Sequence, residues 1–488
     1  MTEKTFLLGF DIGTTAAKGA LFDHRGRQIS FHRATYPTAR PAEGLVEQDP
    51  MDWIAALDQI AAVVTADIDP RTIRAAAICS QVNTHVFVDK SGAPLMPAIV
   101  WQDGRAAAQA AKLDGAVSPA ERQIWWGAPL PIDASHALAR MAWVADHCPE
   151  RWRDTAWVLS PKDFCTFHLT GAVASDPISS IGLVDLDGRY IPALIDRVAG
   201  AAERLPPLRR FTDQLGPMTL AGLGGAAPPV VVGTMDAWAN LFGSGVHEPG
   251  QGIYVSGTSE IIGLVSQSRQ PVDGIVSFLP IDGRHVHAGP TQCGGDALRW
   301  FAVAMERGIE DILEHAGQAG GDSGGVVFLP HMMGERAPVW DPAVRGGFVG
   351  LGGQTGLAQL SLAVLEGVAF SARWLFEAAS LAAGRDYPVL IHSGKGSQSD
   401  LWCQIRADVL GVTLDRVRQH DTGVVGAAML AGVSAGQFAS WAQASAVMVQ
   451  TERRFAPNPR RHDAYARRYE FYRQTYDALA PLYHAREA

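Results

Sequence analysis

Residues 9–18 read GFDIGTTAAK and decide the fold. A strand-like apolar run leads into this stretch from Phe6, and a second one, residues 19–23, follows it, so the pattern predicts two strands joined by a tight turn. Glycine in such a turn lets backbone N–H groups converge on phosphate oxygens, while hydroxyl groups and a nearby cation add to the attraction. The stretch therefore predicts a phosphate-binding hairpin that uses Gly13, Thr14, Thr15 and Lys18.

Asp11 ends the first of these strands. Its carboxylate is placed to hold a magnesium ion through water, because magnesium takes few carboxylates and keeps much of its hydration. An ordinary hairpin with a solvated aspartate is the alternative explanation of the same residues.

The hairpin pattern occurs a second time near the middle of the chain. Residues 252–259 read GIYVSGTS, and an apolar run over residues 261–265 returns from the turn. Two such turns, Gly13-Thr14-Thr15 and Gly257-Thr258-Ser259, can hold one triphosphate from opposite sides. The repeat predicts two similar α/β domains facing each other across an active-site cleft, with residues 1–246 and 247–488 as their bounds.

Two further strand ends carry residues that fit phosphoryl transfer. Residues 230–238 read VVVGTMDAW, so a buried strand places Asp236 at its tip, where a kinase needs a proton acceptor for the attacking hydroxyl. Residues 391–399 read IHSGKGSQS, a glycine turn against which an adenine can lie. A helix N-cap is the alternative for Asp236, and a plain strand-to-helix turn is the alternative for residues 391–399.

Composition excludes several other classes of protein. A chain of 488 residues, 47% hydrophobic and 19% charged, is expected to form two or more globular domains. The net charge of -9 disfavours a nucleic-acid partner, and the longest apolar runs are shorter than the roughly 18 residues of a membrane span. Five scattered cysteines without a CxxC pair, and the absence of an obvious signal peptide, predict a cytoplasmic protein. No Walker A or GxGxxG motif is present.

Together these segments resemble the FGGY carbohydrate kinases, whose fold belongs with actin, hexokinase and the Hsp70 ATPase. The resemblance extends over nearly the whole chain, and its most specific part is residues 350–351 with 363–367. The other matching segments are residues 47–50, 101–105, 143–144, 149–150, 160–163, 169–171, 174–176, 329–330 and 334–338.

The resemblance implies an ATP- and Mg²⁺-dependent kinase and a role for each matching residue. Asp236 is implied as the catalytic base, and Asp11 with Asp236 as the metal-associated carboxylates. The nucleotide-binding residues implied are Gly13, Thr14, Thr15, Lys18, Gly257, Thr258, Ser259, Gly295, Gly394, Gly396 and Ser397. The substrate-binding residues expected are Gln81, Asn83, His85, Trp101, Asp236 and Trp238. Sugar is expected mainly on the first domain and ATP mainly on the second, and a homodimer is a further expectation.

Five positions depart from the patterns common in xylulokinases or in the family. Asn83 and Ala237 replace hydroxyl-binding side chains, and the bulky Trp238 follows, which predicts that D-xylulose is not the best substrate. Arg140 stands where the family usually has lysine, and Lys395 replaces the middle glycine of the adenine turn.

The function expected is therefore transfer of the ATP γ-phosphate to a hydroxyl of a pentulose of the xylulose or ribulose type. Glycerol, erythritol and six-carbon ketoses are alternative substrates. A sugar-sensing regulator without catalysis and a chaperone- or filament-like ATPase are the alternatives from other classes. The retained Asp11 and Asp236 argue against the regulator, and the sugar-side segment 101–105 argues against the ATPase.

Overall fold

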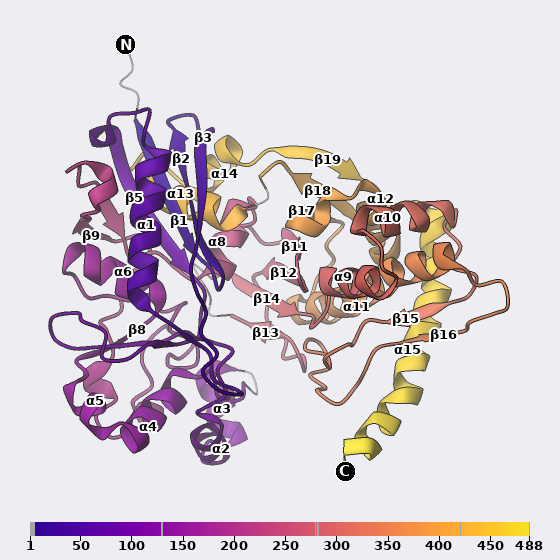
Figure 1. Ribbon diagram of the computed structural model, residues 1–488, viewed down its shortest axis with the longest axis horizontal. Helices are drawn as coiled ribbons and strands as arrows, with labels where there is room; N and C mark the ends of the chain where they lie inside the picture. The colour runs from indigo at the N-terminus through magenta and orange to yellow at the C-terminus, as the bar shows by residue number, and fades with distance from the viewer. Residues whose placement is uncertain (1–4, 128–129, 279, 281–282, 420, 488) are drawn as a thin grey trace. The chain divides into compact units, whose positions relative to one another are not determined.

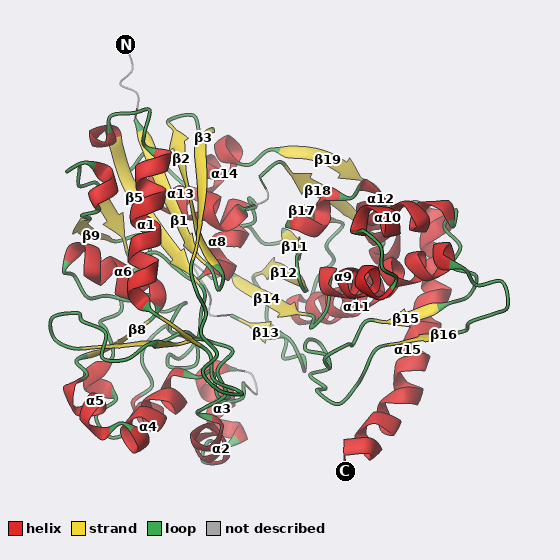
Figure 2. Ribbon diagram, in the orientation of Figure 1, coloured by secondary structure: helices red, strands yellow, loops and turns green. Residues whose placement is uncertain are grey.

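A computed structural model describes residues 5–127, 130–278, 280, 283–419 and 421–487 (Figure 1). By their contacts the residues form two compact units: Met1–Gly245 with Asp421–Val449, and Val246–His420 with Gln450–Ala488. Segment 421–449, which lies in the second half of the sequence, thus packs with the first unit. The domain division expected at residues 246 and 247 stays a prediction. The expected α/β class is confirmed, because each unit contains one large mixed sheet and several helices (Figure 2).

The first unit contains a six-stranded sheet in the order β3-β2-β1-β5-β10-β9. Its strands are β1 (Phe6–Ile12), β2 (Ala16–Asp23), β3 (Gln28–Thr35), β5 (Ile73–Ser80), β9 (Gln214–Pro217) and β10 (Pro229–Val231). β1 and β2 form the predicted antiparallel hairpin, and β5 runs parallel to β1. The tip of the hairpin and the carboxyl end of β5 therefore lie at the same edge of the sheet, where Gln81 N–H bonds to the carbonyl of Ile12 at 2.8 Å.

Helices cover both faces of this sheet. On one face, Trp53 and Ile60 of α1 (Pro50–Val64) pack in one cluster with Phe10 of β1. On the other face lie α8 (Asp236–Gly243) and α13 (Thr422–Ser434). A Cβ on Gly9 would come within 2.4 Å of the carbonyl oxygen of Val424, so glycine at this position allows α13 to lie directly against β1. Figure 1 shows α13, from the late part of the chain, beside the N-terminal strands.

The remaining elements of the first unit are short. Its other helices are α2 (Ala107–Gly115), α3 (Pro119–Trp126), α4 (Ala137–His147), α5 (Pro149–Asp154), α6 (Pro161–Thr170), α7 (Pro192–Ile195) and α14 (Trp441–Met448). Two small two-stranded sheets pair β4 (Glu47–Gln48) with β7 (Ala98–Ile99), and β6 (Val86–Val88) with β8 (Trp157–Leu159).

The second unit contains a seven-stranded sheet in the order β13-β14-β12-β11-β17-β18-β19. Its strands are β11 (Gly252–Ser256), β12 (Glu260–Ser266), β13 (Val276–Ser277), β14 (His285–Pro290), β17 (Val389–Ser393), β18 (Thr413–Val417) and β19 (Thr451–Phe455). β11 and β12 form the second predicted hairpin, and β17 runs parallel to β11. The sheet thus repeats the central arrangement of the first, a hairpin beside a parallel strand.

One apolar core joins the helices of the second unit to its sheet. The helices are α9 (Gly295–Ala304), α10 (Ile309–Gln318), α11 (Leu357–Ala383), α12 (Asp400–Leu410) and α15 (Pro459–Glu487), and β15 (Val327–Leu329) pairs with β16 (Gly347–Val349). Within the described ranges, no helix has the length and apolar character needed to cross a lipid bilayer.

Candidate active site

The tip of the first hairpin brings charged side chains together against α13. Asp11 and Lys18 are cross-strand partners, so their side chains lie on the same face of the sheet. Lys18 Nζ lies 2.6 Å from Oδ1 of Asp421, the residue that precedes α13. Asp11 is only 9% exposed, and a Cβ on Gly423 would lie 3.0 Å from its Oδ2. The N-terminus of α13 therefore packs closely on the Asp11 carboxylate, where its partial positive charge favours an anion.

Asp236 is the first residue of α8, and Met235 before it is the N-cap, so the alternative of Asp236 as the N-cap is wrong. The backbone N–H of Ala237 donates to Asp236 Oδ1 at 2.7 Å, and Asn240 Nδ2 donates to the Asp236 carbonyl at 2.9 Å. Thr422 Oγ1 in turn donates to Asn240 Oδ1 at 2.7 Å. These bonds link the first turn of α8 to the first turn of α13 and hold Asp236 in place relative to it.

The electrostatics of this cluster suit a proton acceptor. Burial and, to a smaller extent, the negative charge of Asp11 raise the pKa of Asp236, the Ala237 N–H and Lys18 oppose the shift, and the resulting pKa is about 7. The side chain is half-buried, so it keeps access to a ligand. Burial also raises the pKa of Asp11, partly offset by Lys18. A carboxylate with a pKa near neutrality accepts a proton effectively at physiological pH.

The same two carboxylates fit a hydrated magnesium ion. In the ranges that the structure describes, no group of three or more His, Cys, Asp and Glu side chains is arranged to ligate a metal. Magnesium needs no such cage, since one or two carboxylates, water and substrate phosphates usually complete its shell. The charge of Asp11 that raises the pKa of Asp236 is the repulsion that a divalent cation would relieve.

Thr14 connects the hairpin to the predicted sugar-binding residues. Its hydroxyl donates to Gln81 Oε1 at 3.1 Å and accepts from Trp101 Nε1 at 2.9 Å. Gln48 Nε2 donates to the Thr14 carbonyl at 2.6 Å, and Gln81 Nε2 donates to Gln48 Oε1 at 3.1 Å. The Thr14 hydroxyl thus orients Trp101, which is 39% exposed. Gln48 lies in segment 47–50, which resembles the family, but the sequence alone does not predict this role for it.

The other two turn residues differ in what they offer a phosphate. The N–H of Gly13 bonds to the carbonyl of Ala16 at 3.1 Å, which closes the turn. Thr15 is exposed at the tip. Of the three predicted phosphate-binding residues here, Thr15 has the most accessible side chain, and the roles of all three stay predictions.

Arg140 holds the loop that carries Asn83 and His85. The guanidinium is fully buried and donates to the carbonyls of Ile99 at 2.8 Å and Val100 at 2.7 Å, to that of Asn83, and contacts His85 Nδ1 at 3.0 Å. Burial lowers the pKa of Arg140 to about 9, and burial together with Arg140 holds the pKa of His85 well below its usual range. His85 is therefore neutral, and Arg140 acts on this loop through backbone carbonyls.

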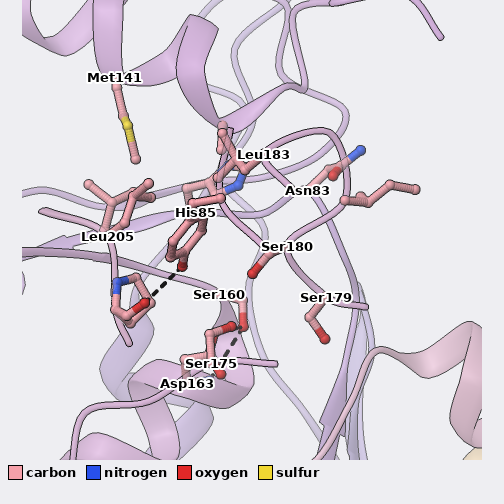
Figure 3. A pocket seen from close by; sticks show the side chains of 15 residues that line it. Asn83, His85, Met141, Ser160, Asp163, Ser175, Ser179, Ser180, Leu183 and Leu205 are labelled. Carbon is pink, nitrogen blue, oxygen red and sulfur yellow. Dashed lines mark hydrogen bonds between the residues drawn. The ribbon is translucent and has the colours of Figure 1, made fainter. Parts of the chain in front are cut away.

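Asn83 and His85 line a small cavity of about 30 Å³ whose walls are partly polar and partly apolar (Figure 3). Serine side chains, among them Ser179 and Ser180, face it from another loop. A cavity needs roughly 10–15 Å³ to hold a water molecule, so this one accommodates one or two waters and is too small for a sugar. Trp238 lies elsewhere: it is 4% exposed, with its ring 5.7 Å from that of Phe242, in a packing position on α8. Its contribution to specificity stays a prediction.

In the second unit, the turn after β11 joins the start of α9. Gly257 N–H bonds to the carbonyl of Ser259 at 3.0 Å, which closes the turn. Gly294 N–H bonds to the carbonyl of Thr258 at 2.8 Å, and Gly295 N–H bonds to that of Gly257 at 2.9 Å. The structure therefore brings together Gly257, Thr258, Ser259 and Gly295, four of the predicted nucleotide-binding residues.

The glycine turn after β17 packs on the same hairpin. A Cβ on Gly394 would lie 2.4 Å from the carbonyl oxygen of Ser256, and a Cβ on Gly396 would lie 2.4 Å from the Ser256 hydroxyl. Gly394 also has φ of 86°, which favours glycine. Ser397 Oγ donates to the Gly394 carbonyl at 2.7 Å. Lys395 is exposed, so its side chain fits where the family has a middle glycine.

Sequence reasoning missed several residues that organise these sites. In the first unit they are Asp421, Thr422 and Asn240, and in the second they are Glu260 and Arg406. Asp421-Thr422-Gly423 before an apolar run is typical of a helix start, and this is the signal in the sequence that indicates where α13 begins. Nothing in the local sequence indicated that this helix end lies at Asp11.

Nearly the whole chain is similar to known proteins. Residues 6–243 match the N-terminal domain of the FGGY family of carbohydrate kinases, and residues 252–435 match its C-terminal domain. A xylulose kinase of Klebsiella pneumoniae is 30% identical over 97% of this chain and 99% of its own. A glycerol kinase of Thermus brockianus is 31% identical over 88% of this chain and 90% of its own. The crystal structure of a xylulose kinase from Rhodospirillum rubrum superposes with a TM-score of 0.87 at 26% identity, covering 98% of this chain and 100% of the other.

Proposed function

Because the chain belongs to the FGGY family of carbohydrate kinases, we propose that it transfers the γ-phosphate of ATP to a hydroxyl of a pentulose of the xylulose or ribulose type. The observation that carries the proposal is Asp236 at the start of α8, with its pKa raised to about 7. Full-length similarity to xylulose kinases supports the class of substrate.

Asp236 accepts the proton of the attacking hydroxyl. Ala237 N–H orients its carboxylate, and the Asn240–Thr422 link fixes its backbone relative to α13, so little reorganisation is needed when the proton moves. Lys18 and the N-termini of α8 and α13 attract the negatively charged phosphate groups to Asp11 and Asp236. Asp11 and Asp236 would hold a hydrated Mg²⁺ through water, and that ion would neutralise charge on the phosphate oxygens.

The sugar is held by the network around Thr14. Trp101 offers an apolar ring face for the carbon chain, and its orientation is set by the hydrogen bond to the Thr14 hydroxyl. Gln81 belongs to the same network, where its buried amide bonds to Thr14 and Gln48 and so supports the Thr14 hydroxyl from behind. Asn83 and Ala237 at positions that bind hydroxyls in xylulokinases favour a pentulose other than D-xylulose.

A substrate panel tests the proposal. ATP consumption by the purified protein is measured with D- and L-xylulose, D- and L-ribulose, glycerol and erythritol, using a coupled assay for ADP. We expect a pentulose other than D-xylulose to give the highest kcat/KM. D-xylulose as the best substrate would overturn the specificity, and sugar binding without any ADP formation would establish a regulator.

Phosphorylation of a polyol is the second candidate function. It is favoured by the identity to a glycerol kinase, 31% over 88% of this chain, which is close to the 30% over 97% for the xylulose kinase. Highest kcat/KM with glycerol or erythritol in the same panel would establish it in place of the pentulose.

A further inference from the structure

An ion pair with no exposed surface lies beneath the second hairpin. Arg406 Nη2 of α12 donates to Oε1 of Glu260, the first residue of β12, at 3.0 Å, and both side chains are 0% exposed. Ser256 Oγ donates to the same oxygen at 2.9 Å. A buried ion pair adds little stability compared with an apolar pair of similar volume, so its presence calls for another role.

The pair touches both parts of the proposed nucleotide site. Glu260 directly follows the phosphate turn, residues 257–259, and its carboxylate holds the Ser256 side chain that precedes that turn. Arg406 Nη1 donates to the carbonyl of Gly396 at 2.9 Å, within the nucleoside turn, residues 394–397. The guanidinium therefore spans from one turn to the other.

Neighbouring groups keep the pair in one geometry. The guanidinium carbon of Arg406 lies 3.9 Å from the centre of the Trp402 ring, which fixes the plane of its donors. The N–H of Glu260 bonds to Thr291 Oγ1 at 3.0 Å, and a Cβ on Gly294 would lie 2.7 Å from Glu260 Oε1. The segment that leads into α9 is thus packed against the same carboxylate.

We propose that the Glu260–Arg406 pair is a brace that sets the spacing between the phosphate turn and the nucleoside turn. Both residues are positioning residues for the nucleotide, since they act through backbone groups of the two turns. The inference rests on the proposed function, because it assigns these turns to one nucleotide. A ligand that contacts both turns depends on their spacing, whereas a ligand that contacts one turn does not.

Three variants separate the brace from its contribution to stability. Arg406→Met leaves the Glu260 charge buried and unpaired, which destabilises the fold. The double variant Glu260→Gln with Arg406→Met removes both charges, so it is expected to recover most of the thermal stability without the bridge to Gly396. Arg406→Lys keeps the charge but loses the planar fork that reaches two acceptors.

A matched control exists in the same unit. Arg468 Nη1 lies 2.8 Å from Oε1 of the buried Glu366, an ion pair between α15 and α11. Neither residue contacts the two turns through any hydrogen bond described above. Arg468→Met therefore reports what the loss of a partly buried ion pair does to this unit in general.

Binding of ATP, of adenosine and of the sugar is measured by calorimetry on the full chain, with thermal melting as the folding check. We expect the double variant and Arg406→Lys to weaken ATP binding about tenfold or more, a coupling in the usual range, with adenosine and sugar affinities nearly unchanged. Arg468→Met should leave ATP affinity near that of the wild type. A folded double variant or Arg406→Lys with normal ATP affinity would overturn the brace. Wild-type protein that binds no ATP would overturn the proposed function instead, so the two failures are distinguishable.

Discussion

The two hairpins share a backbone plan and differ in the placement of charge. In the β1–β2 hairpin, Asp11 and Lys18 lie across from each other at a partly open end of the sheet, next to two helix N-termini. In the β11–β12 hairpin, the charge of Glu260 is fully buried and paired with Arg406. The same Gly-Thr turn therefore presents charges to a ligand in one unit and positions backbone groups in the other.

The largest effect is expected where the first hairpin meets α8. Asp236→Asn keeps the shape and most hydrogen bonds but removes the proton acceptor, so turnover should fall at least about 10²-fold, the lower range for a positioned base. Steady-state rates measure the loss, and calorimetry should show nearly unchanged nucleotide affinity. Asp187→Asn, an exposed substitution in the same unit, serves as the control. Near-normal turnover in folded Asp236→Asn protein would refute the base assignment.

A smaller loss is expected at Asp11, because its carboxylate acts through magnesium. Asp11→Asn should lower turnover by roughly 10-fold to 100-fold, a range typical of partners one step removed from the metal. The midpoint of the magnesium titration should move to higher concentration, and by more than in Asp236→Asn, because Asp236 acts chiefly as the base. An unchanged midpoint would remove Asp11 from the metal site.

The acid limb of the pH profile sharpens the contrast between the two aspartates. The pKa of Asp236 is raised to about 7, so below that pH the protonated carboxyl cannot accept a proton, and kcat/KM should rise with pH and level off above it. Asp11→Asn removes a negative charge that raises this pKa, so the limb should shift to lower pH. A limb that stays in place would show that Asp11 does not influence Asp236.

The smallest effect concerns the hydrogen bond between the first hairpin and Trp101, the residue proposed to pack against the sugar. Trp101→Phe keeps the ring but deletes the hydrogen bond from Nε1 to the Thr14 hydroxyl. One such bond is worth about 0.5–1.5 kcal/mol, so the KM for the sugar should rise a few-fold while kcat changes less. Trp300→Phe, a partly exposed tryptophan of the second unit, is the control. An equal KM for the sugar in both variants would show that this bond does not orient the Trp101 ring.

Much of the site could be predicted because its residues sit at turns. Gly13, Gly257 and Gly394 stand at strand ends, and the structure places all three in turns, where the φ of Gly394 favours glycine. The apolar run before Asp236 predicts that this residue follows a strand, but β10 ends at Val231 and Asp236 is the first residue of α8. Trp238 shows the limit of that reasoning, since the same short stretch could not reveal that its ring is buried against Phe242.

The sequence by itself determined the two hairpins and the glycine turns, because each depends on residues within a few positions of one another. Only the tertiary structure decided the partners: Asp421 at Lys18, and Arg406 beneath the turn that Glu260 follows. Those contacts join residues far apart in the chain, so they exist only once helices have packed on their sheets. The raised pKa of Asp236 has the same origin, since burial and the charge of Asp11 arise from packing and not from the local sequence.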